Sequence, residues 1–97
     1  MLNSVVLVGK IFDINECEKN MTKVTIAVPR PYLNKDSVEE VDLIECTLYG
    51  NVAENTAEFC KKGDTIGVRG RIEKKFNENI VIAEKITFLS ANKKEEK

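Results

Sequence analysis

Polar and apolar residues alternate with a period of two along most of this chain of 97 residues, as in strands whose two faces meet different surroundings. Residues 23–28 show the pattern most clearly, with valine or isoleucine at every second position. Residues 4–12 are apolar and β-branched, and Gly9 interrupts them where we expect a bulge or bend. Both segments are predicted to be strands.

A third strand is predicted over residues 41–49. One face of this strand is expected to enter the core, and it carries Ile44, Cys46 and Leu48. The other face is expected to lie outside, and it carries Val41, Leu43, Glu45, Thr47 and Tyr49.

Two polar segments separate these three strands. Residues 13–22 are predicted to form a loop or loose hairpin. Residues 29–37 contain both prolines of the chain and are predicted to form a loop.

One helix is predicted after residue 50. Asn51 is expected to cap it, with Glu54 three residues later as in a capping box, and Gly63 is expected to end it. Positions 52, 56, 59 and 60 would form its buried stripe. Phe59, together with Phe88 later in the chain, is assigned to the core.

Two further strands, residues 65–76 and 80–89, complete the pattern and are joined by a turn at 77–79. Gly67 and Gly70 allow the sharp bend that closure of a barrel demands. The order β-β-β-α-β-β predicts an all-β fold with one helix, the five-stranded Greek-key barrel called the OB-fold. An open five-stranded α+β sheet is the alternative. Residues 1–90 would form one domain and residues 91–97 a short charged tail in solvent.

The composition disfavours catalysis and metal binding. There is no histidine, which is the usual general base near neutral pH and the commonest zinc ligand. The three cysteines form no C-x-x-C pair, and their number and spacing are typical of reduced thiols in a cytosol. No signal sequence or membrane segment is evident. We therefore expect a cytoplasmic protein that is not an enzyme and needs no metal or cofactor.

The net charge of −1 conceals a segregated distribution. Residues 36–60 contain seven acidic residues and no basic one, whereas residues 61–75 contain six basic residues and two acidic ones. Such segregation can build one positive face on a nearly neutral molecule, although solvated strand edges would produce the same pattern.

Three aromatic residues lie near the ends of predicted strands, among basic residues. Bases of a single strand stack on aromatic faces while lysine and arginine follow its phosphates, so this combination is typical of proteins that bind single strands. The aromatic candidates are Tyr32, Tyr49 and Phe76, and the basic candidates are Arg30, Lys35, Arg69, Arg71, Lys74 and Lys75.

Four stretches of the chain resemble the bacterial single-stranded DNA-binding protein family. They are MLNSVVLVGK, TLYGNVAEN followed by KKGD, VRGRI, and IAEKITFL, in collinear order from Met1 to about Leu89. The resemblance implies an OB-fold protein that coats single-stranded DNA in replication, repair and recombination, usually as a homotetramer. It places Tyr32, Tyr49 and Phe76 where the family stacks bases. It also adds Lys10, Lys61 and Lys62 as basic contacts.

The chain departs from the family pattern in several ways. It has no tryptophan, and Leu43 stands where many members carry one. Glu45 stands on the same face, where a basic residue is common. The chain ends at KKEEK instead of a long Gly/Pro/Gln-rich linker with an acidic tip. We expect either a shortened chain or a compact, tailless member from a bacterial nucleoid, a phage or a mobile element, without recruitment of replication partners through such a tip.

Two other functions share the predicted fold. A primosomal or accessory replication protein would be a tailless OB dimer that passes DNA between partners. A protein-interaction subunit would use the face of Leu43 and Tyr49 and would ignore DNA. The assembly state tests the first alternative, and DNA binding tests the second.

Overall fold

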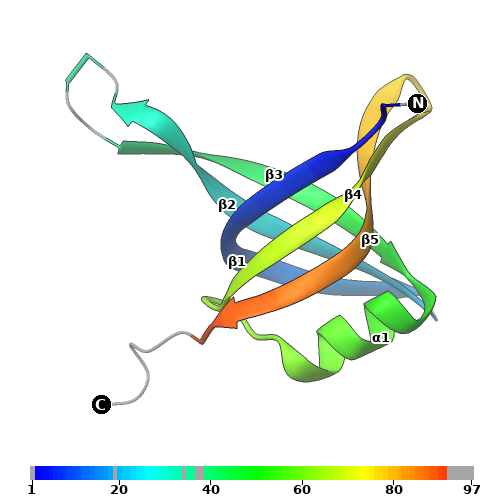
Figure 1. The fold of residues 1–97 in the computed structure, drawn as a ribbon. Helices are drawn as coiled ribbons and strands as arrows, with labels where there is room; N and C mark the ends of the chain where they lie inside the picture. The colour runs from blue at the N-terminus through cyan, green and yellow to red at the C-terminus, as the bar shows by residue number, and fades with distance from the viewer. Residues whose placement is uncertain (1, 19, 34, 37–38, 92–97) are drawn as a thin grey trace.

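The computed structural model describes residues 2–18, 20–33, 35–36 and 39–91, without the side chains of Tyr32 and Leu33. Its elements are β1 (Val5–Glu18), β2 (Met21–Leu33), β3 (Glu39–Tyr49), α1 (Gly50–Phe59), β4 (Thr65–Lys75) and β5 (Glu78–Ser90). The strands close into a barrel in the order β1-β2-β3-β5-β4 (Figure 1). β3 pairs with β5 in parallel, and the other pairs are antiparallel. The predicted barrel and its element order are confirmed, and the open sheet is excluded.

Alternate strand positions fill the interior of the barrel. The side chains with no exposed surface are Val24, Ile26, Cys46, Leu48 and Ile66. The inner faces predicted for residues 23–28 and 41–49 are therefore confirmed. One outer position was predicted wrongly: Thr47 is buried, because it lies in a groove under the β4–β5 hairpin. Within the described chain, no helix has the length and hydropathy needed to cross a bilayer.

β1 and β2 extend beyond their hydrophobic segments. Residues 13–22, predicted to be a loop or loose hairpin, belong to the β1–β2 hairpin and are mostly strand, because the β1–β2 ladder runs from Lys10 opposite Ala27 to Glu18 opposite Met21. Most side chains in this part of β1 are exposed. A strand with two solvated faces loses the alternating pattern by which strands are recognised.

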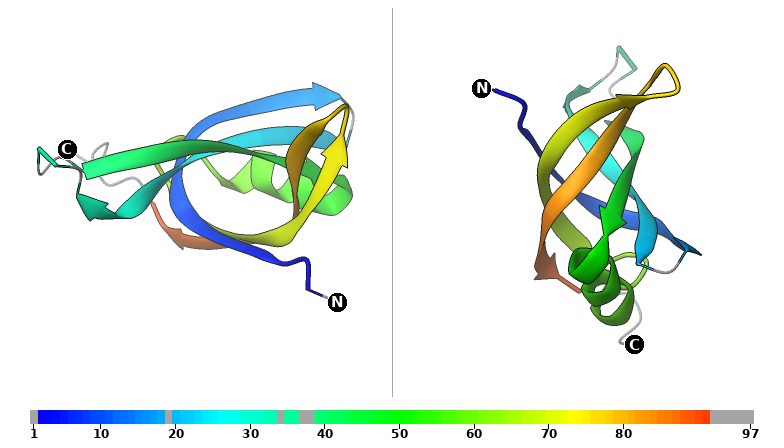
Figure 2. Two further views of the ribbon diagram at one scale, coloured as in Figure 1. Left: turned by 90° about the horizontal axis from the view of Figure 1, so that it is seen from above. Right: turned by 90° about the vertical axis from the view of Figure 1, so that its right-hand side faces the viewer.

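β2 also continues through both prolines to Leu33, so the loop predicted over residues 29–37 is largely wrong. This end of β2 and the start of β3 form an arm that projects from the barrel (Figure 2). In the described ladder, β1 pairs with β2 no further than Ala27, and the β2–β3 register shifts between Pro29 and Leu33. Proline is tolerated on such a strand edge because the edge needs no N–H donor.

α1 begins earlier and ends earlier than predicted. Tyr49 is its N-cap, without a side-chain hydrogen bond, and Gly50 has a φ of 64°. That left-handed conformation lets the chain turn directly from β3 into the helix, so Asn51 is not the cap. The backbone is already extended at Cys60, so Gly63 does not end the helix.

The assignment of Phe59 and Phe88 to the core is wrong. The face of α1 that closes one end of the barrel carries Ala53 and Thr56, and the buried side chain that follows them is Cys60. Phe59 lies off this stripe and is 69% exposed. Phe88 lies near the end of β5 and is 52% exposed.

Two glycines permit close approaches between strands. A Cβ at Gly70 would overlap the carbonyl oxygen of Ile82, where the β4–β5 register shifts. A Cβ at Gly9 would overlap the carbonyl oxygen of Ala27 in β2. The irregularity expected at Gly70 thus has a steric cause. At Gly9 the pairing with β4 is regular, and the register of β1 shifts further on, between Ile11 and Asp13, so the bulge expected at Gly9 is displaced. Gly67 has ordinary room around it.

Candidate nucleic-acid interface

A groove of about 330 Å³ lies between the β4–β5 hairpin and the outer face of β2 and β3. The residues that line it are Met21, Lys23, Glu45, Thr47, Tyr49, Lys75, Phe76, Glu78 and Ile80. Three predicted contact residues meet there: Tyr49 from the end of β3, Lys75 from the end of β4, and Phe76 from the following turn.

Tyr49 is fixed at one end of the groove by backbone pairing. It is paired with Met21 of β2, and the N–H of the next residue, Gly50, donates to the carbonyl of Asn20 at 2.9 Å. The residue is 44% exposed. A rigid backbone therefore presents an accessible phenol ring, which suits a stacking platform.

The ammonium group of Lys75 lies beside this ring. Its Nζ donates to the Tyr49 hydroxyl at 3.5 Å and lies 5.8 Å from the ring centroid. A cation this close to a ring is attracted to its π face. A stacking surface and a positive charge thus lie side by side, and they match the base and the phosphate of a nucleotide.

Phe76 has a backbone conformation that is unfavourable for a phenylalanine. The turn between β4 and β5 consists of Phe76 and Asn77, with φ values of 52° and 64°, and Lys75 pairs with Glu78. The turn predicted at 77–79 is therefore displaced. Positive φ at both central residues is typical of type I′ hairpins, which favour Asn and Gly and strain a bulky residue. Because Phe76 is also 97% exposed, packing does not explain an aromatic residue here.

Two predicted arginine contacts are engaged by carboxylates of the protein. On the arm, Arg30 donates to Glu40 and to Asp42, each at 2.8 Å. The hydrogen bond from Arg30, followed by its charge, lowers the pKa of the Asp42 carboxyl. On β4, Arg71 donates to Glu73 and Glu84, each at 2.6 Å, and these bonds raise the pKa of Arg71.

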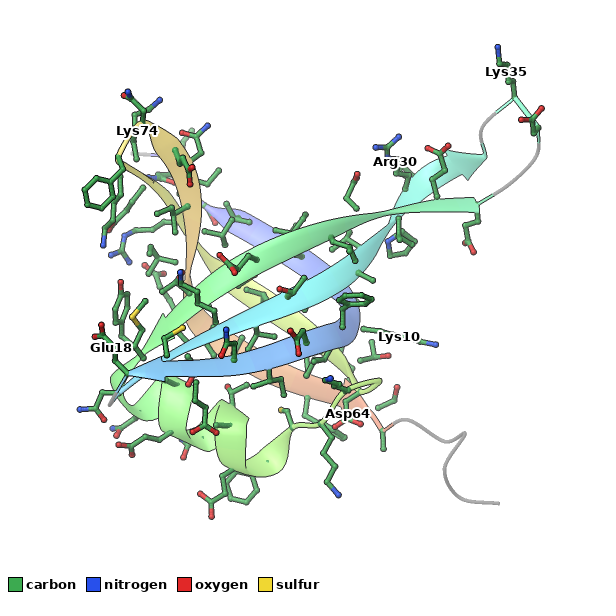
Figure 3. The ribbon with its side chains drawn as sticks, turned by 180° about the vertical axis from the view of Figure 1, so that it is seen from behind. Lys10, Glu18, Arg30, Lys35, Asp64 and Lys74 are labelled. Atoms are coloured by element: carbon green, nitrogen blue, oxygen red, sulfur yellow. The ribbon has the colours of Figure 1, made fainter. Side chains whose placement is uncertain are left out.

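The other predicted contacts are dispersed over the molecule. Figure 3 shows Lys74 at the β4–β5 hairpin, Lys35 at the end of the arm and Lys10 on β1. Lys62 lies 3.5 Å from Asp13 as an ion pair. The exposed predicted contacts include Lys10, Lys35, Lys61, Arg69 and Lys74. The backbone of Tyr32 lies in β2 on the arm, and its side chain is outside the described residues.

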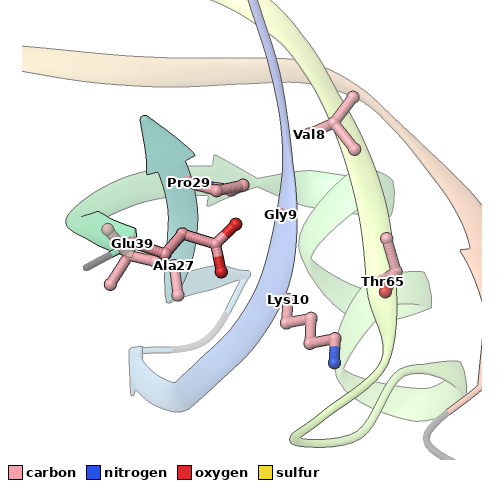
Figure 4. Close-up of a pocket in the computed structure, with 8 residues that line it drawn as sticks. Val8, Gly9, Lys10, Ala27, Pro29, Glu39 and Thr65 are labelled. Atoms are coloured by element: carbon pink, nitrogen blue, oxygen red, sulfur yellow. The ribbon is translucent and has the colours of Figure 1, made fainter. Parts of the chain in front are cut away.

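A second hollow, of about 340 Å³, lies between β1 and the base of the arm (Figure 4). Its lining residues are Val8, Gly9, Lys10, Ala27, Pro29, Glu39, Val41 and Thr65. Lys10 is the one predicted contact among them, and none of these lining residues is aromatic. The groove, in contrast, combines aromatic rings with lysines, so it is the stronger candidate site.

The sequence reasoning missed Lys23 as a groove residue. It lies on the outer face of β2, opposite Thr47 of β3, and is half-buried in the groove. In the sequence it is far from any aromatic residue. Only the antiparallel register between β2 and β3 places it near Tyr49, and the alternation of residues 23–28 is the signal that could have indicated its outward direction.

Within the part of the chain that the structure describes, the cysteines and acidic residues form no second chemical site. Cys46 and Cys60 are buried and Cys17 is exposed, all as free thiols. Burial, followed by the charge of Glu45, raises the pKa of Cys46 to about 11, so this thiol stays protonated near neutral pH. Among the residues described, no three potential metal-ligating side chains are grouped together.

One known protein family matches nearly the whole chain. The model of the single-strand binding protein family matches residues 2–90. The chain belongs to this family. The match confirms the resemblance carried by the four sequence stretches, and it covers every element of the barrel.

Relatives within the single-strand binding protein family support the assignment. Single-stranded DNA-binding protein B of Bacillus subtilis is 38% identical over 84 residues, which are 81% of this chain and 74% of that protein. Single-stranded DNA-binding protein 3 of Listeria innocua is 34% identical over 105 residues, covering 94% of this chain and 66% of the relative. The single-stranded DNA-binding protein of Halalkalibacterium halodurans is 37% identical over 103 residues, which cover 92% of this chain and 61% of that protein.

Solved structures show the same fold. The small single-stranded DNA-binding protein of Streptomyces coelicolor superposes with a TM-score of 0.67 at 14% identity, over 92% of this chain and 95% of that one. A small single-stranded DNA binding protein of Mycoplasma pneumoniae superposes with a TM-score of 0.67 at 24% identity, over 89% of this chain and 92% of that one.

Proposed function

We propose that this chain binds single-stranded DNA of any sequence, without catalysis, and protects it during replication, repair and recombination in the bacterial cytoplasm. Membership of the single-strand binding protein family supports this function. The observation that carries the site is the groove in which Tyr49, Lys75 and Phe76 meet. A phage or mobile element would be an equally suitable source for such a protein.

The groove would hold the strand by two different forces. Bases stack on Tyr49 and Phe76, each worth roughly 1–3 kcal/mol, and every base offers a π face. Lys74 and Lys75 on the hairpin, with Lys23 below it, neutralise phosphates. Stacking resists salt, whereas the lysine contacts weaken with it.

Beyond the groove, the strand would follow the β2–β3 ribbon towards the arm. The proposed contacts there are Tyr32, Arg30 and Lys35, and those on the rest of the barrel are Lys10, Lys61, Lys62, Arg69 and Arg71. For Arg30, Arg71 and Lys62, a phosphate would have to replace a carboxylate, so we expect these three to contribute less.

We further propose that the chain acts as a homo-oligomer, with a tetramer favoured. Large apolar side chains on the outer faces of β1 and β5 support association: Val6 is 70% exposed, and Val8 and Leu89 are each 49% exposed. Light scattering after gel filtration tests the assembly. A tetramer agrees with the proposal, and a dimer would favour a tailless accessory replication protein.

The function is tested by fluorescence anisotropy of a labelled oligo-dT of about 35 nucleotides, long enough for several subunits. The same titration uses a duplex of equal length and a series of salt concentrations. Tight binding to the single strand that persists at high salt is expected, with weak binding to the duplex. Equal binding that salt abolishes would indicate only a basic patch. No binding would favour a protein partner on the face of Leu43, which is 52% exposed.

A further inference from the structure

The groove contains two carboxylates, which a surface built only for phosphates would not carry. Glu45 and Glu78 line it together with Lys23 and Lys75. A phosphate group placed beside Glu45 would be repelled. The part of a nucleotide that suits a carboxylate is a base edge with N–H donors.

Glu45 is positioned to meet the edge of a base on Tyr49. Both residues lie on the outer face of β3, with Thr47 between them. At about 3.3 Å per residue their Cα atoms are roughly 13 Å apart, a distance that a stacked base and a glutamate side chain span together. Because the Thr47 side chain is buried, it does not fill the space between Tyr49 and Glu45, and Lys23 of β2 borders this space.

We propose that Glu45 reads the edge of the base stacked on Tyr49 and favours bases with an exocyclic amino group over thymine. This preference rests on the proposed function and adds a modest selectivity to it. The carboxylate accepts a hydrogen bond from the amino group of cytosine, as it also can from adenine or guanine. Thymine has no amino group, and the two carbonyl oxygens that flank its N–H repel the carboxylate. Lys23 can donate to the acceptor atoms beside the amino group of cytosine.

Competition between short oligonucleotides tests this reading. The probes are dC and dT oligomers of about ten nucleotides, close to the span of one barrel, at mildly alkaline pH where cytosine is neutral. The proteins are the full chain, its Glu45→Gln variant and the control Glu54→Gln. The control removes an exposed carboxylate from α1, outside the groove lining. Because Glu45 is itself exposed, the variant is expected to fold, which circular dichroism verifies.

We expect the unmodified chain to bind dC about fivefold more tightly than dT, the effect of one charged hydrogen bond in a partly solvated groove. Glu45→Gln should bring the ratio close to one and strengthen dT binding, because the repulsion is gone. Glu54→Gln should leave the ratio unchanged.

Equal affinity for dC and dT in the unmodified chain, or a ratio that survives Glu45→Gln, would overturn the role of Glu45 and leave single-strand binding intact. Binding of neither oligomer would overturn the proposed function itself. The two failures are therefore distinguishable in one experiment.

Discussion

Basic residues near the two ends of the β2–β3 ribbon lie in different electrostatic settings, Arg30 on the arm and Lys75 of β4 at the groove. At the arm, Arg30 lies between the carboxylates of Glu40 and Asp42. At the groove, the ammonium group of Lys75 contacts the Tyr49 hydroxyl and ring. From this comparison we expect a basic residue without a carboxylate partner to contribute more to the binding of a phosphate than one that is already paired.

On the arm, the charged side chains link the two strands to each other. Arg30 links β2 to β3 near the prolines, where the register of the ladder is irregular. Exposed ion pairs of this kind are worth little in stability. A phosphate that displaced Glu40 or Asp42 would also release a carboxylate beside it, so the net gain in binding would be small.

The largest expected effect comes from removing the stacking platform. Tyr49→Ala should weaken single-strand binding by roughly 1–3 kcal/mol at every salt concentration, because stacking does not depend on counterion release. Anisotropy titrations measure it, with Tyr49→Phe as the matched control that keeps the ring and loses only the hydroxyl that accepts a hydrogen bond from Lys75. An unchanged affinity in Tyr49→Ala would mean that the strand binds elsewhere, for example on the arm.

Phe76→Asn should have two opposite effects. Asparagine tolerates a positive φ, so the hairpin should become more stable by about 1 kcal/mol. Loss of the exposed ring should weaken single-strand binding by about 1 kcal/mol or more. Thermal unfolding and anisotropy measure the two quantities, and a variant that is more stable yet binds equally well would show that Phe76 contacts no base.

The salt dependence of binding compares the two ends directly. Lys75→Gln should lower the slope of log affinity against log salt by about one unit, the loss of one phosphate contact. Arg30→Gln should change the slope by much less, because Arg30 is already engaged by Glu40 and Asp42. Equal losses in the two variants would remove the distinction between groove and arm.

The smallest effect concerns pH at the arm. Because Arg30 lowers the pKa of Asp42 below its ordinary 3.8, the ion pair stabilises the fold above that value and is lost as pH falls through the lower, folded value. An NMR titration of the Asp42 carboxyl carbon should show the lowered midpoint, and Arg30→Gln should raise it towards 3.8. A midpoint that Arg30→Gln does not move would show that the pair is absent in solution.

The sequence predicted the barrel because its inner faces are periodic. The faces of residues 23–28 and 41–49 could be read directly, and the order of elements followed from them. The extensions of β1 and β2 could not, since most side chains there are exposed and the period is lost. Phe59 shows the converse error, because an apolar residue close to a buried stripe need not belong to it.

Much of the candidate site was beyond sequence reasoning because it depends on register. Tyr49, Lys75 and Phe76 were predicted, whereas Lys23 enters the groove only through the pairing of β2 with β3. The charge pattern was also incomplete as a guide. It separated an acidic stretch from a basic one. In the fold, however, two residues of the acidic stretch, Glu40 and Asp42, form ion pairs with Arg30, which lies outside both stretches.

The most direct test of the account is photocrosslinking of the full chain to a single strand that carries iododeoxyuridine, followed by mass spectrometry of the crosslinked peptides. Aromatic residues that stack on the base should react, so we expect crosslinks at Tyr49 and Phe76. Crosslinks confined to the arm or to α1, with none in the groove, would contradict the central claim that the strand is bound between the β4–β5 hairpin and the outer face of β3.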